Sequence, residues 1–232
     1  MATTIAHCAW SSIPIVETLI LVAKVSDFEG LVTEAVLNKA EKKRQLRFKK
    51  TEDRQRYCVA HAIKRHVLSQ YIGEAAIMLS FDEGRYGKPY CNHPSSPFFN
   101  ISHSEDWAAF IVSQVADVGI DIQSPRRVSQ ERILRRIGSP NQIKDYLASD
   151  DKDESFFNLW TQKEAVSKAH GQGLSIGFSA IETSALLSDQ EIDVMGEYYH
   201  VNTVKYHQMS LSYASKAKMS STVCRLYPPE LL

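Results

Sequence analysis

The residues best suited to chemistry fall in a predicted helix between Leu159 and Ala169. Good helix formers fill this stretch and Gly171 follows it, which predicts about three helical turns ended by a glycine. Trp160, Glu164 and Lys168 are spaced four apart, so an aromatic ring, a carboxylate and an ammonium share one face. The carboxylate can bind Mg²⁺ or accept a proton, and the ammonium can hold a phosphate oxygen. The same spacing is typical of surface ion pairs on helices, so a functional interpretation needs partners elsewhere in the chain.

The composition is that of an ordinary globular protein. The chain has 232 residues, enough for one large domain or two fused halves, and its 27 Lys and Arg balance 27 Asp and Glu. Overall charge therefore predicts neither nucleic-acid binding nor membrane binding. The apolar run Ile13–Val25 is too short to span a bilayer and contains Glu17. The four cysteines lie far apart without metal-ligand spacing, so we expect free thiols and a cytoplasmic protein.

A basic segment runs from Lys39 to Arg65 and holds 11 of the 27 positive charges. Apolar residues repeat at helical spacing from Tyr57 to Tyr71, which predicts a helix with one buried face and arginines on another. A solvated charged surface explains such a run, and so does binding of a polyanionic ligand or an acidic protein. Duplex DNA is disfavoured because no nucleic-acid motif accompanies the segment.

A short loop at 82–89 contains Gly84, Gly87, Lys88 and Pro89. Two glycines and a proline predict a tight turn from which the lysine projects. A purely structural turn and a lysine held rigidly for a ligand are both compatible with this pattern.

Two apolar strands are predicted at Trp107–Val112 and Val118–Ile122, and the short connection between them predicts an antiparallel hairpin. In the second strand Asp121 lies opposite the apolar face, next to a glycine that permits close approach. Such an aspartate can be a solvated strand end. Together with Glu164, it can instead supply a second oxygen ligand for a hard cation such as Mg²⁺.

Ser102, His103 and Asp106 lie close together in the sequence, but they do not indicate a hydrolytic triad. Neighbouring residues cannot align a nucleophile, a base and an orienting acid, and no Gly-x-Ser-x-Gly elbow surrounds the serine. Hydroxyls and an imidazole in a loop between aromatic segments suit phosphate binding, with a structural loop as the alternative.

Four stretches together resemble the Sfp-type 4′-phosphopantetheinyl transferases. They are Gly87-Lys88-Pro89, Phe99-Asn100-Ile101-Ser102-His103-Ser104, Gly119-Ile120-Asp121-Ile122 and Trp160-x-x-Lys163-Glu164-Ala165-x-x-Lys168-x-x-Gly171-x-Gly173-Leu174. The last pattern is specific, whereas the first is weak alone. The resemblance runs from about Lys42 to about Phe178, and the strand-rich tail fits less specifically.

The resemblance implies an α+β fold of two similar halves related by a pseudo-twofold axis, with the active site in the cleft between them. We place these halves at residues 1–113, expected to be the basic side that binds coenzyme A and the carrier, and 114–232, expected to hold the metal and the catalytic helix. The family transfers the 4′-phosphopantetheine group of coenzyme A to a serine of an acyl or peptidyl carrier protein, with Mg²⁺ and release of 3′,5′-ADP. We therefore expect coenzyme A and an apo carrier protein as partners of a monomer, with Mn²⁺ as a possible substitute for Mg²⁺ and no nucleic-acid or membrane partner.

The resemblance also assigns catalytic roles. Asp121 and Glu164 match the metal-binding carboxylates, and Glu164 is also the candidate base toward the carrier serine. Lys168 matches the lysine that contacts the transferred phosphate. His103 is the third candidate catalytic residue.

A second set of residues matches the coenzyme A contacts of the family. Ser102, His103 and Lys88 resemble phosphate contacts, to which Lys168 also belongs. Arg44 and Arg56 fall where the family has basic residues around the nucleotide.

Gln123 departs from the family pattern, which usually has a glutamate two residues after the strand aspartate. Glutamine keeps an oxygen but lacks the charge, so its place as a third metal ligand is open. The alternative function is therefore a catalytically weakened homologue that binds coenzyme A or a carrier protein without efficient transfer. An unrelated Mg²⁺-dependent nucleotide enzyme would require the resemblance of all four stretches to be a coincidence.

Overall fold

The computed structural model describes residues 5–32 and 34–228, which form a mixed α+β fold. The contacts between residues divide the chain into two compact units. The first comprises the residues up to Asp82, Pro89–Val115 and those from Ser220 onward, and the second comprises Glu83–Lys88 and Ala116–Met219. The predicted halves, 1–113 and 114–232, divide the chain only once. The structure divides it at several points because the C-terminal strand and one short loop are grouped with partners distant in sequence.

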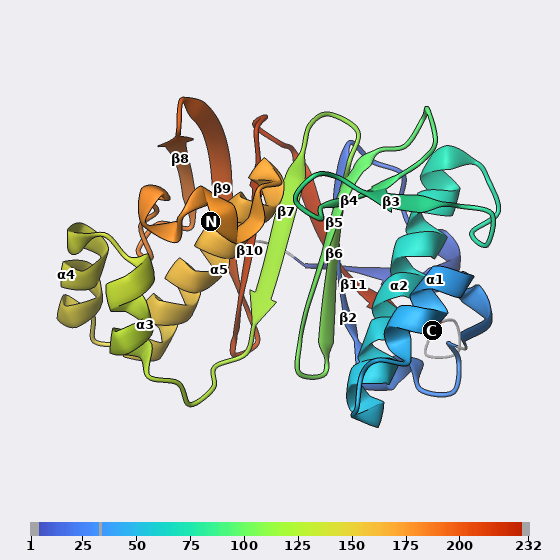
Figure 1. The fold of residues 1–232 in the computed structure, drawn as a ribbon, viewed down its shortest axis with the longest axis horizontal. Coiled ribbons are helices and arrows are strands. Elements are labelled where there is room, and N and C mark those ends of the chain that lie inside the picture. The colour runs from blue at the N-terminus through green and yellow to red at the C-terminus, as the bar shows by residue number, and fades with distance from the viewer. Residues whose placement is uncertain (1–4, 33, 229–232) are drawn as a thin grey trace. The chain divides into compact units, whose positions relative to one another are not determined.

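A mixed five-stranded sheet with the order β1-β11-β2-β6-β5 forms the first unit. Strand β11 runs parallel to β1 and β2, and the other pairs are antiparallel. Helix α2 packs along β6 and β5, over an apolar core that helix and sheet share (Figure 1). The elements are β1 (Ala6–Ala9), β2 (Thr18–Lys24), β5 (Phe98–Ser104), β6 (Trp107–Ser113), β11 (Ser221–Tyr227), α1 (Lys39–Gln45), α2 (Thr51–Ile72), the 3₁₀ helices Trp10–Ser12, Val25–Phe28 and Glu34–Val36, and the small hairpin strands β3 (Phe81–Glu83) and β4 (Pro89–Cys91).

The sequence explains where the elements of this unit begin and end. Strand β2 is a β-branched and aliphatic run that is buried from Thr18 to Ala23, as expected for a strand in the interior of a sheet. Helix α1 begins with a capping box in which the side chains of Asn38 and Glu41 each accept a hydrogen bond from the other's backbone N–H. Helix α2, also predicted, ends at Gly73 with φ of 80°, a left-handed conformation that glycine adopts without a Cβ clash.

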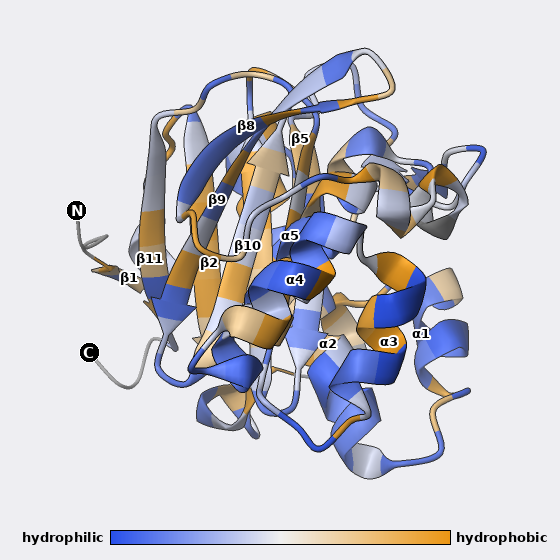
Figure 2. Cartoon of the chain, turned by 90° about the vertical axis from the view of Figure 1, so that its left-hand side faces the viewer, coloured by the Kyte–Doolittle hydropathy of each residue, from blue (hydrophilic) through white to orange (hydrophobic). Residues whose placement is uncertain are grey.

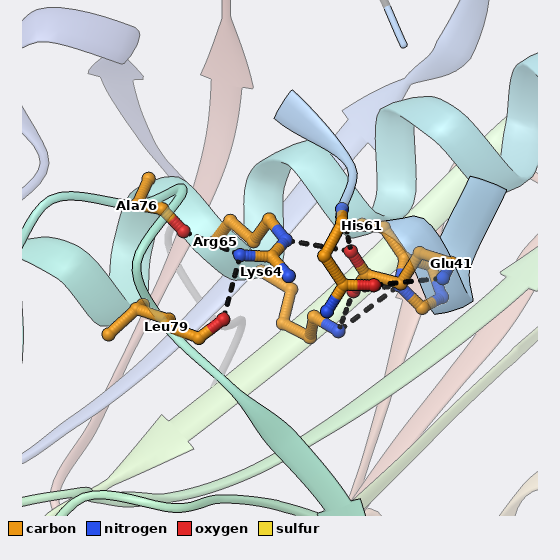
Figure 3. A network of polar contacts seen from close by, with 7 residues as sticks. Glu41, His61, Lys64, Arg65, Ala76 and Leu79 are labelled. Atoms are coloured by element: carbon orange, nitrogen blue, oxygen red, sulfur yellow. Dashed lines mark hydrogen bonds and ion pairs between the residues drawn. The ribbon is translucent and has the colours of Figure 1, made fainter. Parts of the chain in front are cut away.

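The predicted basic segment contains a buried ion cluster (Figure 3). Lys64 Nζ and Arg65 Nε donate to the two carboxylate oxygens of Glu41 at 2.7 and 2.8 Å, and His61 Nδ1 lies 3.1 Å from the same carboxylate. Arg65 also donates to two carbonyls of the loop that follows α2. Lys64 and Arg65 are 3% and 0% exposed. These two charges of the basic segment therefore belong to the interior of the first unit, in what we call the Glu41 cluster (Glu41, His61, Lys64 and Arg65).

An antiparallel four-stranded sheet with the order β7-β10-β9-β8 forms the second unit. Helix α5 packs across β7 and β10 (Figure 1), and α4 packs against α5. Helices α3 and α4 carry both hydrophilic and hydrophobic residues (Figure 2). The elements are β7 (Val118–Gln123), β8 (Asp189–Val194), β9 (Glu197–Tyr206), β10 (Met209–Ser215), α3 (Gln130–Ile137), α4 (Pro140–Ala148), α5 (Lys152–His170) and the 3₁₀ helices Gly173–Ile176 and Phe178–Ala180.

Helix α5 is longer than the sequence pattern predicts, because Leu159–Ala169 is only its C-terminal part. Asp151 caps its N-terminus by accepting a hydrogen bond from the Glu154 backbone N–H at 2.9 Å. Acidic residues in a first turn are favourable next to the positive end of the helix dipole. The helix ends at Gly171 with φ of 85°, which confirms the predicted glycine stop.

The predicted hairpin between Trp107–Val112 and Val118–Ile122 is wrong. Strand β6 pairs with β2 and β5, whereas β7 pairs with β10. The two strands therefore lie in different sheets and different units. Alternating apolar residues and a short connection also occur where a chain passes from one sheet to another, so local sequence cannot identify the partner of either strand.

The four cysteines are buried free thiols. Burial raises the pKa of the Cys224 thiol to about 12, with a further contribution from a hydrogen bond with Cys8. Among residues 5–32 and 34–228, no helix is long and apolar enough to cross a membrane.

Candidate active site

Close packing of α5 against β7 creates the candidate site. Gly119 in β7 faces α5, and a Cβ atom at this position would lie 2.0 Å from the Ala165 carbonyl oxygen and 2.4 Å from the Ala169 nitrogen. A larger residue would therefore force the helix away from the strand. Asp121 stands two residues further along the same face of β7. The glycine thus sets the distance at which the strand aspartate meets the side chains of the helix.

Asp121 and Lys168 form the centre of the site. Lys168 Nζ donates to Asp121 Oδ1 at 2.6 Å and to the Ile120 carbonyl oxygen at 2.9 Å. Asp121 is 7% exposed, so it is not a solvated strand end. Its position opposite the apolar residues Val118, Ile120 and Ile122 is as predicted, and these three are buried as well. Strand β7 therefore holds a carboxylate where little water can screen it.

Glu164 lies one helical turn before Lys168. Burial raises the pKa of the Glu164 carboxyl, the negative charge of Asp121 raises it further, and the ammonium of Lys168 lowers it in part. Two carboxylates thus share one ammonium, which leaves a net negative charge when both are ionised. We call Asp121, Glu164 and Lys168 the α5–β7 cluster.

The donor set of the α5–β7 cluster fits a hard cation. Mg²⁺ binds oxygen ligands and commonly takes only one or two protein carboxylates when substrate phosphates complete its coordination. Asp121 and Glu164 supply such carboxylates. Within the part of the chain that the structure describes, no three His, Cys, Asp or Glu side chains gather into a metal centre. A cation at these two residues would take its remaining oxygen ligands from water and substrate.

Gln123 follows Asp121 on the same face of β7. Its side chain is half-buried, and its amide nitrogen donates to the Ser124 carbonyl oxygen at 3.4 Å. It lines a small pocket together with Trp160 and Phe156. The Trp160 ring stacks on Phe156. Trp160, which was predicted to share a helix face with Glu164 and Lys168, therefore forms an apolar wall of this pocket. The role of Gln123 as a metal ligand stays a prediction.

Lys163 of the family pattern has a structural position. It is fully buried and donates to the carbonyl oxygens of Phe178 and Ile181 at 2.7 and 2.5 Å. Burial lowers the pKa of its ammonium to about 8, and the charge of Glu182 opposes this change. Lys163 therefore fastens the segment after α5 to the helix that carries Glu164 and Lys168.

Lys88 does not project freely from its turn. Its ammonium donates to Asp117 Oδ1 at 2.7 Å and to the Ala169 carbonyl oxygen at 3.0 Å. Because Ala169 is in the last turn of α5, Lys88 lies at the C-terminal end of the helix that carries Glu164 and Lys168. Lys88 and α5 both belong to the second unit. Its predicted contact with coenzyme A stays a prediction.

Ser102 and His103 lie in strand β5, not in a loop. Successive residues of a strand point to opposite faces, and accordingly Ser102 is buried whereas His103 is exposed. Asp106 accepts hydrogen bonds from the backbone and hydroxyl of Ser26 at 2.9 and 2.6 Å. The two predicted phosphate contacts therefore do not share one face of β5.

Arg44 and Arg56 lie on separate helices of the first unit. Arg44 is exposed in the last turn of α1. Arg56 in α2 is partly exposed and forms an ion pair with Asp53 at 3.2 Å. The predicted site residues thus divide between the two units, and the structure brings Asp121, Glu164 and Lys168 together in the second.

Sequence reasoning missed two groups of charged residues. Asp117 pairs with Lys88, and the only local signal was an acidic residue just before a predicted strand. The second group consists of exposed arginines that follow β7 in the chain. They are Arg126, Arg127, Arg132, Arg135 and Arg136. The density of arginines along the sequence would have found this group, because five fall within the eleven residues 126–136.

Two family profiles match consecutive parts of the chain. Residues 25–115 match the profile described as 4′-phosphopantetheinyl transferase, N-terminal. Residues 117–209 match the profile described as 4′-phosphopantetheinyl transferase superfamily. Together these two matches account for most of the chain.

Curated relatives carry the same description. The chain is 33% identical over 147 residues to the 4′-phosphopantetheinyl transferase HetI of Nostoc sp., covering 61% of this chain and 62% of the relative. It is 35% identical over 133 residues to 4′-phosphopantetheinyl transferase Sfp of Bacillus subtilis, covering 56% and 58%. For psf-1 of Bacillus pumilus the identity is 32% over 145 residues, covering 62% and 61%. The matched part thus spans about three fifths of the length of these relatives.

Among solved structures, holo-acyl-carrier-protein synthase of Thermotoga maritima matches 43% of this chain and 62% of its own, at 20% identity and a TM-score of 0.31. A score this low does not bear on the fold. The relationship of this chain to the 4′-phosphopantetheinyl transferases therefore rests on the two sequence profiles and on the relatives that are about one-third identical to it.

Proposed function

The chain belongs to the 4′-phosphopantetheinyl transferase superfamily, and from this premise we propose that it transfers the 4′-phosphopantetheine group of coenzyme A to a serine of an acyl or peptidyl carrier protein. The reaction would convert the apo carrier to its holo form and release 3′,5′-ADP. The observation that carries this proposal is the α5–β7 cluster, in which Lys168 is held 2.6 Å from Asp121 while the pKa of Glu164 is raised. A fixed ammonium and two neighbouring carboxylates are groups that can position and stabilise the charges of phosphoryl transfer.

Lys168 is the proposed partner of the transferred phosphate. Its hydrogen bonds to Asp121 and to the Ile120 carbonyl fix the ammonium before the substrate binds. Displacement at phosphorus needs chiefly positioning and stabilisation of the charge on the phosphoryl oxygens. A preorganised ammonium supplies both without reorganising during the reaction.

Glu164 is the proposed base. Because burial and Asp121 raise its pKa, its ionised form takes up a proton more readily than an exposed glutamate does. The carrier serine oxygen would bond to the phosphorus that bears the pantetheine arm while the diphosphate P–O bond breaks. The serine proton would pass to Glu164, and the bonding electron pair would leave with 3′,5′-ADP. His103, on the exposed side of β5, is the remaining proposed catalytic residue.

Asp121 and Glu164 would hold Mg²⁺ or Mn²⁺, and Gln123 is the candidate third ligand. The cation would neutralise part of the diphosphate charge. The proposed contacts of coenzyme A are those that the family resemblance assigns. They are Arg44, Arg56, Ser102, His103, Lys88 and Lys168.

The exposed arginines that follow β7 suit an acidic carrier protein. They begin three residues after Gln123, on the connection to α3 and on α3 itself, and so belong to the same unit as the α5–β7 cluster. Association through exposed charges is screened beyond about 8–10 Å at physiological ionic strength. The KM for the carrier should therefore rise with salt while kcat changes little, and a salt-independent KM would contradict this docking.

A single incubation tests the proposed reaction. The protein is mixed with apo carrier proteins of the fatty-acid, polyketide and nonribosomal-peptide types, with coenzyme A and Mg²⁺, and the carriers are weighed by mass spectrometry. We expect one phosphopantetheine group per reactive serine and an equal amount of 3′,5′-ADP. Unmodified carriers at saturating coenzyme A would contradict transfer. If calorimetry still detected binding of coenzyme A or carrier, the weakened-homologue alternative, favoured only by Gln123, would hold.

A further inference from the structure

Lys88 and Asp117 form an ion pair at the C-terminal end of α5. Lys88 Nζ lies 2.7 Å from Asp117 Oδ1 and 3.0 Å from the carbonyl oxygen of Ala169, in the last turn of the helix. The lysine side chain passes over Gly171, where an added Cβ would lie 3.3 Å from Lys88 Cδ. Asp117 stands directly before β7, and Lys88 closes a turn in which Gly84 N–H donates to the Lys88 carbonyl at 2.9 Å. Both ends of the pair are thus tied to secondary structure.

The geometry accounts for two of the three N–H groups of the Lys88 ammonium. Asp117 and Ala169 each accept one, so the third can donate to a further acceptor without breaking either bond. The Lys88 side chain is 18% exposed, so it is not closed off from solvent. A lysine whose three N–H groups all donated to protein acceptors could bind a phosphate oxygen only by breaking one of those hydrogen bonds.

Asp117 also keeps the ammonium charged. Burial lowers the pKa of Lys88, whereas the hydrogen bond and the charge of Asp117 raise it, and the nearby charge of Lys216 lowers it again. Lys216 is itself paired with Glu197 at 3.0 Å. The carboxylate of Asp117 is therefore the counter-ion that offsets the cost of holding Lys88 partly buried.

We propose that Asp117 is a positioning residue, which holds the Lys88 ammonium so that its third N–H donates to a phosphate oxygen of coenzyme A. This inference rests on the proposed function, since it names how one predicted contact of that site is built. Asp117 itself touches no reacting atom. Its effect is on the strength of coenzyme A binding, through Lys88.

Steady-state kinetics of Asp117→Asn provide the main test. Asparagine keeps the size of the side chain but removes the charge, and loss of one positioned, charge-assisted hydrogen bond should raise KM for coenzyme A about tenfold. We expect kcat to stay within about twofold, because α5 and its catalytic residues remain in place. Asp145→Asn, an exposed acid on α4, is the matched control and should leave both constants unchanged.

A double-mutant cycle separates positioning from an independent effect. Lys88→Ala should raise KM by at least as much as Asp117→Asn, and adding Asp117→Asn to Lys88→Ala should have no further effect. Additive changes would overturn the inference, as would a lower KM in Asp117→Asn, which would mean that the carboxylate repels the substrate. A fall in melting temperature with an unchanged KM would also overturn it, because Lys88 would then only cap the helix.

Two measurements remain informative if no carrier is modified. Calorimetry gives the Kd of coenzyme A directly, and this Kd should rise about tenfold in Asp117→Asn. Acetylation of Lys88 by acetic anhydride, followed by peptide mass spectrometry, should increase in this variant because only the neutral amine reacts. Unchanged acetylation and unchanged Kd would refute the positioning role, whatever the outcome of the transfer assay.

Discussion

Each of the two units places a glutamate near a lysine, but the units balance the charges differently. In the first unit the single carboxylate of the Glu41 cluster meets Lys64, Arg65 and His61 (Figure 3). Burial raises the pKa of Glu41, yet hydrogen bonds from His61 and Lys64, the charge of Lys64 and the Asn38 backbone together lower it well below its usual range. Cations outnumber carboxylates, and every change that removes the carboxylate leaves buried positive charge.

In the second unit the ratio is reversed. Asp121 and Glu164 share Lys168, and the pKa of Glu164 is raised by burial and by Asp121. A carboxylate surrounded by cations, as in the Glu41 cluster, holds helices together, whereas a cluster with an excess carboxylate can still take up a proton or a cation. The two clusters thus differ in charge balance, and we expect this difference to separate a structural ion cluster from the proposed catalytic one.

Glu41→Gln should produce the largest effect, and it acts on stability. The substitution leaves Lys64 and Arg65 buried without their counter-ion, which typically costs about 3–5 kcal/mol. Urea unfolding should therefore show a much lower free energy of unfolding, with kcat per folded molecule near that of the wild type. Glu29→Gln, at an exposed position of the same unit, is the control. An unchanged free energy of unfolding would mean that the Glu41 cluster does not stabilise the unit.

Replacing the glutamate of the α5–β7 cluster by glutamine should instead lower activity and leave stability intact. Glu164→Gln, and likewise Lys168→Ala, should lower kcat about 10²–10³-fold or more, because each removes a preorganised charge from the reacting groups. The free energy of unfolding should stay unchanged or rise slightly in Glu164→Gln, since repulsion from Asp121 is relieved. Lys144→Ala on α4 is the exposed control. Unfolding with near-normal activity per folded molecule would place these side chains in the core and remove the contrast between the clusters.

Much of the second cluster follows from sequence, because its residues obey local rules. Helical spacing places Glu164 and Lys168 on one face, and strand alternation places Asp121 opposite the apolar residues of β7. The Glu41 cluster was not predicted, since its carboxylate and its cations lie on two helices and a solvated charge cannot be told from a buried one within one helix. The false hairpin and the missed pair of Lys88 with Asp117 have the same cause. Each depends on which distant segments meet, and local periodicity does not encode that.

Gln123→Glu offers the finest test of the charge balance, because it adds a third carboxylate beside the α5–β7 cluster. Gln123 shares a face of β7 with Asp121, and its amide donates to the Ser124 carbonyl at 3.4 Å. A full charge about 4 Å from a cation is worth up to about 4 kcal/mol per unit of cation charge at an effective dielectric constant of 20, before the cost of desolvation. Most of that gain would be offset if Mg²⁺ kept waters and diphosphate oxygens as ligands, as it commonly does.

We therefore expect the wild type to be active with a high Mg²⁺ requirement, and Gln123→Glu to reach half-maximal rate at a Mg²⁺ concentration lower by roughly tenfold or less, with similar maximal turnover. Initial rates at increasing Mg²⁺ and Mn²⁺ concentrations measure this for both proteins. Superimposed curves would show that position 123 does not contact the cation. A wild type inactive at every concentration, beside an active Gln123→Glu, would mean that the excess of two carboxylates over one ammonium is too small to recruit the cation. The chain would then act by binding coenzyme A or its carrier protein.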